Sequence, residues 1–199
     1  MRTFAALLLV TALGTASAAV VTFDGYQPLY DFSQSTVQTE GFVFSVGCVN
    51  CMGVEDRPPT EIGGNPLPGA FNGTPSLIYS VDPLSITAVD GGGFFLDRLE
   101  LGLSWYVPDV DVGSAVTISY VLAAGGAGSV QGVLDRSYTT FLVGQQVLSV
   151  SISGGRGFGY VTLDNLVVNT VPEPESAGLA LVALLCAGAA MGRRAQRPS

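Results

Sequence analysis

The chain contains few of the side chains that catalyse reactions or hold metal ions. Its 199 residues include three cysteines, sixteen acidic residues and no histidine. The lack of histidine excludes imidazole bases, histidine-containing triads and histidine metal ligands. The sequence also has no G-x-S-x-G turn that would carry a serine nucleophile. We therefore do not expect an enzyme, and a hydrolase that uses two carboxylates is the least favoured alternative.

The one compact group of reactive side chains is Cys48-Val49-Asn50-Cys51. A C-x-x-C motif can form a redox pair, half of a zinc site, a haem attachment or a plain disulfide. Zinc needs four ligands, which this chain does not supply, and haem attachment needs a histidine where Met52 stands. A thioredoxin-like pair would begin a helix, whereas here a proline-rich segment follows. We expect a structural disulfide in an exported protein, with redox chemistry as the alternative.

The acidic charge of the chain limits its partners. Sixteen acidic residues against eight basic ones, all arginines, give a net charge of −8. Such a chain is a poor candidate for binding nucleic acid or anionic lipid. Calcium, neutral sugars and basic partners are compatible with it.

Apolar residues alternate along short segments, which predicts strands rather than helices. Glycine, at 26 residues, falls mostly between these segments, where turns are expected. Each segment has one apolar face and one face of small polar residues, as in an antiparallel sandwich. The apolar faces are Phe42/Phe44/Val46, Leu99/Leu101/Leu103/Trp105/Val107, Val116/Ile118/Tyr120/Leu122 and Leu148/Val150/Ile152. The sequence therefore predicts an all-β fold, an antiparallel β-sandwich.

The alternation changes phase at two places, and each contains an aspartate. Asp97-Arg98 and Asp164-Asn165 each insert two polar residues between leucines that should face inward. An extra residue in one strand, a β-bulge, would produce such a shift. The alternative is that these strands are covered on both faces or end at the aspartates.

The pattern breaks over residues 47–83, where six prolines and several glycines predict a long loop. A loop of this length in a compact domain is usually functional or disordered. We expect it to pack over one end of the sandwich through Ile62, Leu67 and Phe71. Asn72-Gly73-Thr74 is formally a glycosylation sequon, but turn chemistry explains it better.

The start of the chain has the composition of a secretory signal. Arg2 supplies a positive charge, Phe4 to Leu13 an apolar stretch, and Ala16-Ser17-Ala18 a small-residue cleavage site. The apolar stretch is too short to span a membrane. We expect residues 1–18 to be a signal helix that is removed on export, and residues 19–170 to form the β-sandwich ectodomain.

The last 29 residues combine three features in a fixed order. Pro172-Glu173-Pro174 comes first, an apolar run at residues 177–192 follows, and Arg193, Arg194 and Arg197 form a basic tail. The sixteen uncharged residues can form a helix of about 24 Å, somewhat short for a membrane span. The arginines would be retained on the cytoplasmic side.

This order of features resembles the PEP-CTERM sorting signal. In that family exosortase, a cysteine transpeptidase embedded in the membrane, processes the segment in bacteria that make exopolysaccharide. The resemblance implies that residues 171–199 are a sorting segment, which anchors the chain transiently in the inner membrane by a C-terminal transmembrane helix. It also implies processing near Pro172-Glu173-Pro174 and release to the cell surface. An ordinary tail anchor is the alternative.

Three short motifs of the middle region recur together: Phe23-Asp24-Gly25, Gly41-Phe42-Val43-Phe44 and Leu163-Asp164-Asn165-Leu166-Val167-Val168. They resemble ectodomains upstream of PEP-CTERM signals and jelly-roll carbohydrate-binding modules. In such modules the first and last strands are neighbours, and acidic groups from both often hold a structural calcium. The resemblance therefore implies a jelly-roll-like sandwich with Asp24 and Asp164 as candidate calcium ligands. Calcium takes six to eight oxygens, and the sequence does not identify the others.

These expectations describe an exported, non-catalytic surface or extracellular-matrix protein that exosortase sorts and that associates with exopolysaccharide. A carbohydrate-binding module is the alternative function.

Overall fold

The computed structural model describes residues 18–25, 29–56, 69–80, 83–104, 113–154 and 160–169. Residues 1–17 of the expected signal helix (1–18) and the sorting segment at residues 171–199 lie outside these ranges, and Ala18 is described as the first residue of a strand. Ala18–Thr170 form one compact unit. Over the described ranges, no helix is long and apolar enough to cross a membrane.

The described chain is built from strands, and every pairing between them is antiparallel. The strands are β1 (Ala18–Val21), β2 (Leu29–Gln34), β3 (Thr36–Thr39), β4 (Phe42–Ser45), β5 (Met52–Glu55), β6 (Ser76–Tyr79), β7 (Leu84–Ala88), β8 (Phe94–Leu103), β9 (Ser114–Leu122), β10 (Ala127–Leu134), β11 (Thr139–Gly154) and β12 (Val161–Asn169).

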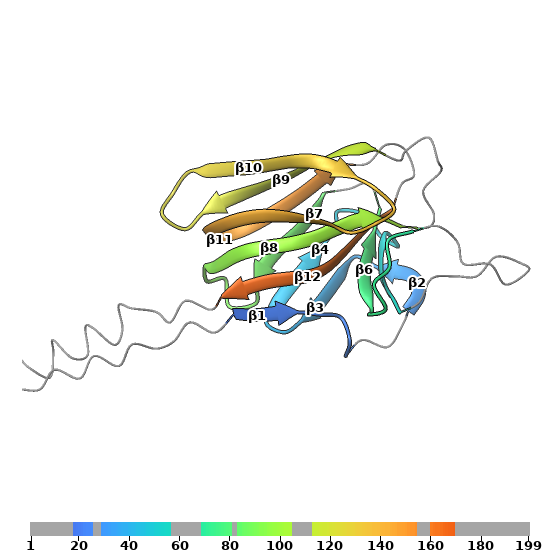
Figure 1. Cartoon of the computed structure of the whole chain (residues 1–199). Helices are drawn as coiled ribbons and strands as arrows, with labels where there is room; N and C mark the ends of the chain where they lie inside the picture. Colours follow the sequence, from blue (N-terminus) through green and yellow to red (C-terminus); the bar gives the residue numbers. More distant parts are fainter. Residues whose placement is uncertain are drawn as a thin grey trace, which may run out of the picture. The chain divides into compact units, whose positions relative to one another are not determined.

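Two sheets joined through the long strand β11 form a sandwich (Figure 1). Sheet I has the order β2-β5-β6-β12-β8 and ends with residues 139–147 of β11. Sheet II has the order β3-β4-β7-β11-β9-β10, in which residues 149–152 of β11 pair with β7 on one side and β9 on the other. Register shifts within β11 accompany its passage from one sheet to the other. The predicted antiparallel β-sandwich is confirmed.

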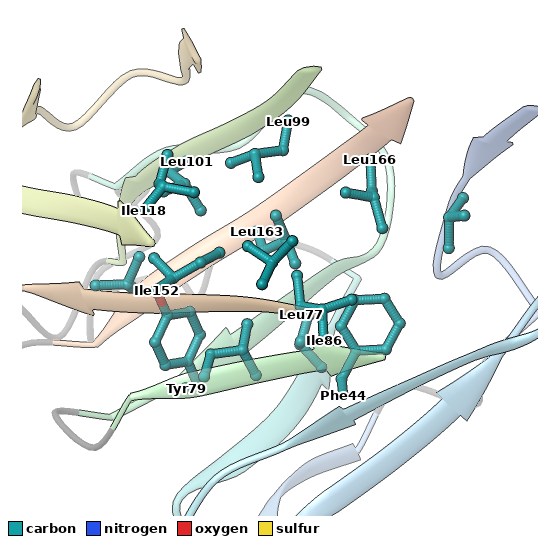
Figure 2. Close-up of a cluster of buried hydrophobic side chains, with 14 of the residues drawn as sticks. Phe44, Leu77, Tyr79, Ile86, Leu99, Leu101, Ile118, Ile152, Leu163 and Leu166 are labelled. Atoms are coloured by element: carbon teal, nitrogen blue, oxygen red, sulfur yellow. The ribbon is translucent and has the colours of Figure 1, made fainter. Parts of the chain in front are cut away.

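The core lies between the sheets and is built from the alternating apolar faces. Leu99 and Leu101 from sheet I belong to one buried cluster with Ile118, Ile152 and Phe44 from sheet II (Figure 2). All five side chains are fully buried. Burying one such side chain contributes about 1.5–3 kcal/mol relative to exposure. The alternating pattern therefore determines which face of each strand points inward.

Both phase shifts in the sequence lie at β-bulges, one of the two interpretations left open, and β12 is also buried on both faces around Asp164. Asp164 of β12 pairs with Glu100 of β8, and the next pair is Val167 with Arg98. Two residues of β12 thus oppose one residue of β8, and Asn165 within this bulge adopts a φ of 47°. The second shift lies between the pair Val167–Arg98 and the pair Val168–Leu96, where Asp97 is the extra residue of β8.

The assignment of Leu148 to the apolar face of β11 is wrong. The register between β11 and β9 shifts between Val147 and Ser149, which leaves Leu148 as an extra residue that is 42% exposed. Val150 and Ile152 are buried, as the alternation predicts. The bulge gave no signal in the pattern, because Leu148 is apolar and continues the alternation of Val150 and Ile152.

The segment at residues 47–83 is not a continuous loop. It contains β5 and β6, which pair with each other and bury apolar side chains in the core. Each strand has only four residues, too few for alternation to stand out among the prolines and glycines. Phe71, one of the three expected anchors, is 37% exposed, and Ile62 and Leu67 lie outside the described residues.

The first and last strands are neighbours, as the resemblance to jelly rolls implies. β1 pairs with β12, beginning with Ala18 opposite Asn169. Phe23 then enters the core and packs edge-on against Phe44, with ring centroids 5.3 Å apart. Both described ends of the compact unit therefore lie side by side.

Candidate functional site

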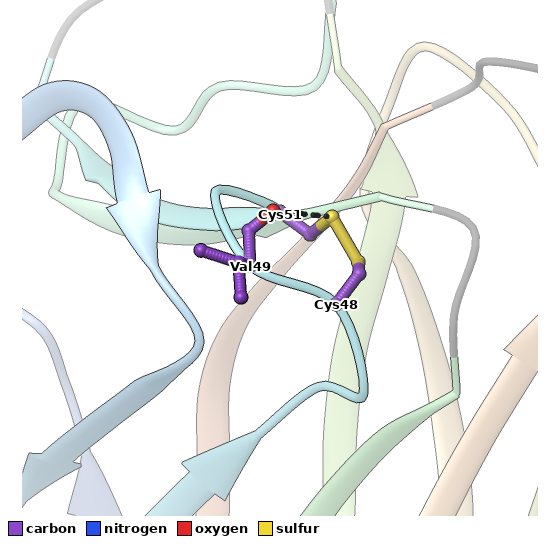
Figure 3. The surroundings of a disulfide bond; sticks show 3 residues. All are labelled: Cys48, Val49 and Cys51. Carbon is purple, nitrogen blue, oxygen red and sulfur yellow. Dashed lines mark hydrogen bonds between the residues drawn. A yellow bond between two sulfur atoms is a disulfide. The ribbon is translucent and has the colours of Figure 1, made fainter.

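The C-x-x-C motif forms the predicted disulfide, in the turn between β4 and β5 (Figure 3). The Cα atoms of Cys48 and Cys51 are 5.7 Å apart, and Asn50 between them has a φ of 63°. The carbonyl of Cys51 accepts a hydrogen bond from the backbone N of Ser80 at 2.8 Å. The Cys51 Sγ lies 3.4 Å from the Val49 carbonyl oxygen, a contact only, since a disulfide sulfur has no proton to donate. No helix begins at Cys48, so the geometry of a thioredoxin-like thiolate is missing.

A polar cluster lies on the outer face of sheet I, around Asp164. Glu100 pairs with Asp164 across β8 and β12, and Glu55 pairs with Ser76 across β5 and β6. The register of β12 with β6 places Asp164 and Ser76 on the same face. Asp164, Ser76 and Glu55 are all buried, which is uncommon for the two acidic residues among them.

Three donors hold the carboxylate of Asp164. Its Oδ2 accepts from Asn72 Nδ2 at 2.7 Å and from Thr74 Oγ1 at 2.9 Å, and its Oδ1 accepts from the backbone N of Asn165 at 2.8 Å. Asn72 Oδ1 in turn accepts from the backbone N of Thr74 at 3.1 Å and lies 2.6 Å from Thr74 Oγ1, so the single hydroxyl proton of Thr74 is shared between Asn72 Oδ1 and Asp164 Oδ2. We call Asn72, Thr74 and Asp164 the loop clip, because together they fasten residues 69–75 to β12.

A glycine allows the loop to approach the sheet. A Cβ atom added at Gly102 of β8 would overlap the Cβ of Ala70. The backbone N of Ala70 donates to the carbonyl of Leu103 at 2.8 Å. The clip and this contact therefore cover the outer face of sheet I, where Thr162 is completely buried.

Burial raises the pKa of the Asp164 carboxyl above its ordinary range, because desolvation disfavours the charged form. The hydrogen bonds from Asn72, Thr74 and Asn165 lower this pKa, and the charge of Glu100 raises it. Asn165 Nδ2 donates to Glu100 Oε2 at 2.9 Å and so engages the second carboxylate.

The same environment acts on Tyr138. Burial raises the pKa of its phenol to about 12, while the hydroxyls of Ser76 and Thr162 lower it. The phenol is therefore neutral at physiological pH.

The Asp164 carboxylate fastens the loop to β12. Its Oδ2 accepts hydrogen bonds from the loop, and its Oδ1 accepts from the backbone of Asn165. This arrangement could not be predicted from the sequence, because Asn72 and Asp164 are separated by 92 residues and the contact depends on how the loop folds back.

Asp24 does not take part in this cluster. It is exposed, in the turn after β1, and none of the three hydrogen bonds to Asp164 involves it. Calcium is coordinated by oxygens, whereas two of the three groups at Asp164 are N–H donors, so the residues present do not fit the ion. Among the described residues, no three or more acidic, histidine or cysteine side chains are grouped to hold a metal.

A row of hydroxyl side chains, one per strand, crosses the outer face of sheet II. Cross-strand pairs link a serine or threonine of each strand to one on the next. The row consists of Thr36, Ser45, Ser85, Ser151, Ser119 and Ser129. Neighbouring strands lie about 4.8 Å apart, so the hydroxyls repeat at about that spacing. We call these six residues the hydroxyl row.

The paired residues that lie two positions along the strands from the hydroxyl row are also uncharged. They comprise Gln38, Val43, Thr87, Ser149, Val121 and Ala127 on one side, and Gln131, Thr117 and Ser153 on the other. No aspartate, glutamate or arginine occurs at these paired positions, although the chain carries a net charge of −8. The sequence shows that individual strands have small polar faces, but the row depends on the register between strands that are far apart in the chain.

No family model matches the chain, and no curated protein matches it. Solved structures show a coarse similarity of fold. The chain is similar to TmCBM61, solved in complex with beta-1,4-galactotriose, at 10% identity and a TM-score of 0.39, over 64% of this chain and 86% of that chain. It is similar to a family 30 carbohydrate-binding module at 10% identity and a TM-score of 0.30, over 79% of this chain and 98% of that chain.

An arabinose-bound α-L-arabinofuranosidase also shows this similarity, at 10% identity and a TM-score of 0.41. The match covers 78% of this chain and 27% of the enzyme, so the chain spans about a quarter of that protein. Scores at this level describe a shared strand arrangement, and no functional argument rests on them.

Proposed function

We propose that this chain is an exported, non-catalytic protein that binds neutral polysaccharide through the hydroxyl row of sheet II. The observation that carries the proposal is a face of six strands with one hydroxyl per strand and no charged side chain at the paired positions. Each serine or threonine hydroxyl both donates and accepts hydrogen bonds, as sugar hydroxyls do. The proposal corresponds to a carbohydrate-binding module within a surface or extracellular-matrix protein.

The twist of sheet II limits how many strands one stiff glycan can touch. Neighbouring strands rotate by about 20–25°, so the six strands accumulate a rotation of about 100°. A straight chain therefore follows roughly three strands, and we assign the contact to Ser85, Ser151 and Ser119 on the adjacent strands β7, β11 and β9.

The contact is weak for a single molecule. Neutral hydrogen bonds contribute about 0.5–1.5 kcal/mol each, which places a small set of them near millimolar affinity. Many copies on one surface would bind a polymer far more tightly, because later contacts form at high effective concentration. The net charge of −8 favours neutral over acidic polymers.

Affinity electrophoresis in gels that contain neutral or acidic polysaccharides tests the proposal. The unmodified protein should be retarded by at least one neutral polymer, and Ser151→Lys should lose this retardation because a long charged side chain interrupts the row. The matched control is Thr140→Lys on the same strand, since Thr140 is exposed and lies opposite Glu100 on sheet I. Retardation that is equal in both variants, or absent with every neutral polymer, would overturn the proposal.

The order of terminal features supports a second part of the proposal, that exosortase sorts this protein. Residues 1–18 would direct export, and Pro172-Glu173-Pro174 would mark the processing region ahead of the apolar run and the arginines. Intact-mass measurement of the surface form tests this part. A host with the transpeptidase should yield a shortened C-terminus, and a host without it should yield the full tail in the membrane fraction. A full tail in both hosts would leave the segment as an ordinary anchor.

A further inference from the structure

The loop clip contains the sequence feature most susceptible to a spontaneous chemical change. Asn72 is followed by Gly73, and this is the one Asn-Gly pair in the chain. Glycine has no Cβ, so the backbone nitrogen after Asn72 is unhindered. Asparagine in this context can cyclise on its own backbone.

The reaction needs no reagent except water. The backbone nitrogen of Gly73 attacks Cγ of Asn72, the bond from Cγ to Nδ2 breaks, and Nδ2 leaves as ammonia. Water then opens the resulting succinimide at one of its two carbonyls and yields aspartate or isoaspartate. A neutral amide is thereby replaced by a carboxylate.

We propose that Asn72 is a deamidation site whose rate is controlled by the loop clip, and that its deamidation releases residues 69–75 irreversibly. This inference does not depend on polysaccharide binding. In the closed clip, Thr74 engages Asn72 Oδ1 twice, and Asp164 holds Nδ2, the leaving atom, at 2.7 Å. Both ends of the amide are fixed, so the side chain must leave Asp164 before it can close the ring.

The product cannot re-form the clip. A carboxylate at position 72 would face the carboxylate of Asp164, and when both are ionised, as mildly alkaline pH favours, neither group has the proton that Asn72 Nδ2 supplied. The two charges also repel at this distance, in surroundings that already disfavour charge on Asp164. Isoaspartate adds a main-chain atom as well, which changes the path of the turn. Release would uncover the outer face of sheet I at Ser76 and Thr162, both buried at present.

Peptide mass spectrometry of the full chain, aged at mildly alkaline pH, measures the rate at Asn72. The native protein should react more slowly than the same protein in denaturant. Thr74→Ala removes the hydroxyl that bonds both Asn72 and Asp164, so the native rate should rise about tenfold, the factor that corresponds to about 1.4 kcal/mol. Val89→Ala removes a side chain of the same size at a residue that is 49% exposed and belongs to neither candidate site, so it should leave the rate unchanged. Equal rates in native and denatured protein, or no acceleration in Thr74→Ala, would overturn the proposed control.

Asn72→Asp reproduces one product and tests the release separately. Hydrogen exchange at the backbone N of Thr74 and of Ala70, both bonded in the closed loop, should accelerate at least tenfold in this variant. Exchange in β9 and β10, which lie in the other sheet, should keep its rate. Unchanged protection at Thr74 and Ala70 would show that deamidation does not release the loop.

Discussion

At the scale of single residues, burial and hydrogen bonding act in opposite directions on Asp164. Desolvation raises its pKa, and three donors lower it, with desolvation the larger effect. The native state therefore binds this proton more tightly than the unfolded chain does. By linkage, the contribution of Asp164 to the free energy of unfolding falls as the pH rises from the ordinary aspartate range, about 3.9, through the raised pKa. Asp164 therefore holds the loop, but its contribution to the free energy of unfolding is smaller at neutral pH than in acid.

Asp164→Asn tests this balance. Asparagine offers one acceptor oxygen where Asp164 receives three hydrogen bonds, so we expect a loss of about 1–3 kcal/mol. The variant also lacks the titration, so the advantage of the unmodified protein should be largest in acid and narrow as the pH rises. Urea unfolding at a series of pH values measures both quantities. Parallel stability profiles for the two proteins would contradict the raised pKa.

The disulfide illustrates a residue-scale prediction from the sequence that the structure confirms. The absence of histidine and of two further thiols left few uses for the C-x-x-C motif, and the bond between Cys48 and Cys51 closes a four-residue ring. A ring this small restricts the unfolded chain little, so replacing both cysteines with serine should cost at most about 2 kcal/mol. Thermal melting of the double variant checks the value. A much larger loss would mean that the turn positions β5 more strongly than the ring size implies.

At the scale of elements, alternation in the sequence predicts a strand well only where the strand is long and flanked by clear turns. The stripe from Leu99 to Leu103 predicted β8, and the phase shifts predicted the bulges, because each shift contains polar residues within an apolar strand. β5 and β6 were missed because four residues give only two per face. Their place in sheet I depends on contacts with β12, far along the chain.

The covering of sheet I by residues 69–75 yields a prediction at this scale. Gly102→Ala places a methyl group where the Cβ of Ala70 lies, so the loop must move away from the sheet. We expect a loss of about 1–3 kcal/mol and faster hydrogen exchange at the backbone N of Ala70. Gly25→Ala is the matched control, because no atom lies within 4 Å of a Cβ added there. Equal exchange at Ala70 in both variants would show that close approach at Gly102 does not hold the loop.

At the scale of the whole molecule, the sandwich brings its two described ends together, with Ala18 opposite Asn169. Strand composition and the short terminal motifs led to this expectation, whereas the two candidate sites could not be predicted. The hydroxyl row joins six strands from Thr36 to Ser151, and the loop clip joins Asn72 to Asp164. Both depend on register and long-range pairing, which a single sequence does not encode in any local pattern.

The pairing of the ends predicts which N-terminal residues the fold needs. A chain that begins at Ala19, as signal removal would leave it, retains most of β1 and the buried side chains of Val21 and Phe23. It should therefore melt at the same temperature as the full chain. A chain that begins at Asp24 loses both side chains and exposes the edge of β12 at residues 166–169. Removing a buried phenylalanine side chain alone costs about 3–5 kcal/mol, which for a domain of this size lowers the melting temperature by about 10 °C or more. Thermal melts of the two shortened chains measure the difference, and equal melting temperatures would show that β1 is dispensable and that the paired ends do not stabilise the sandwich.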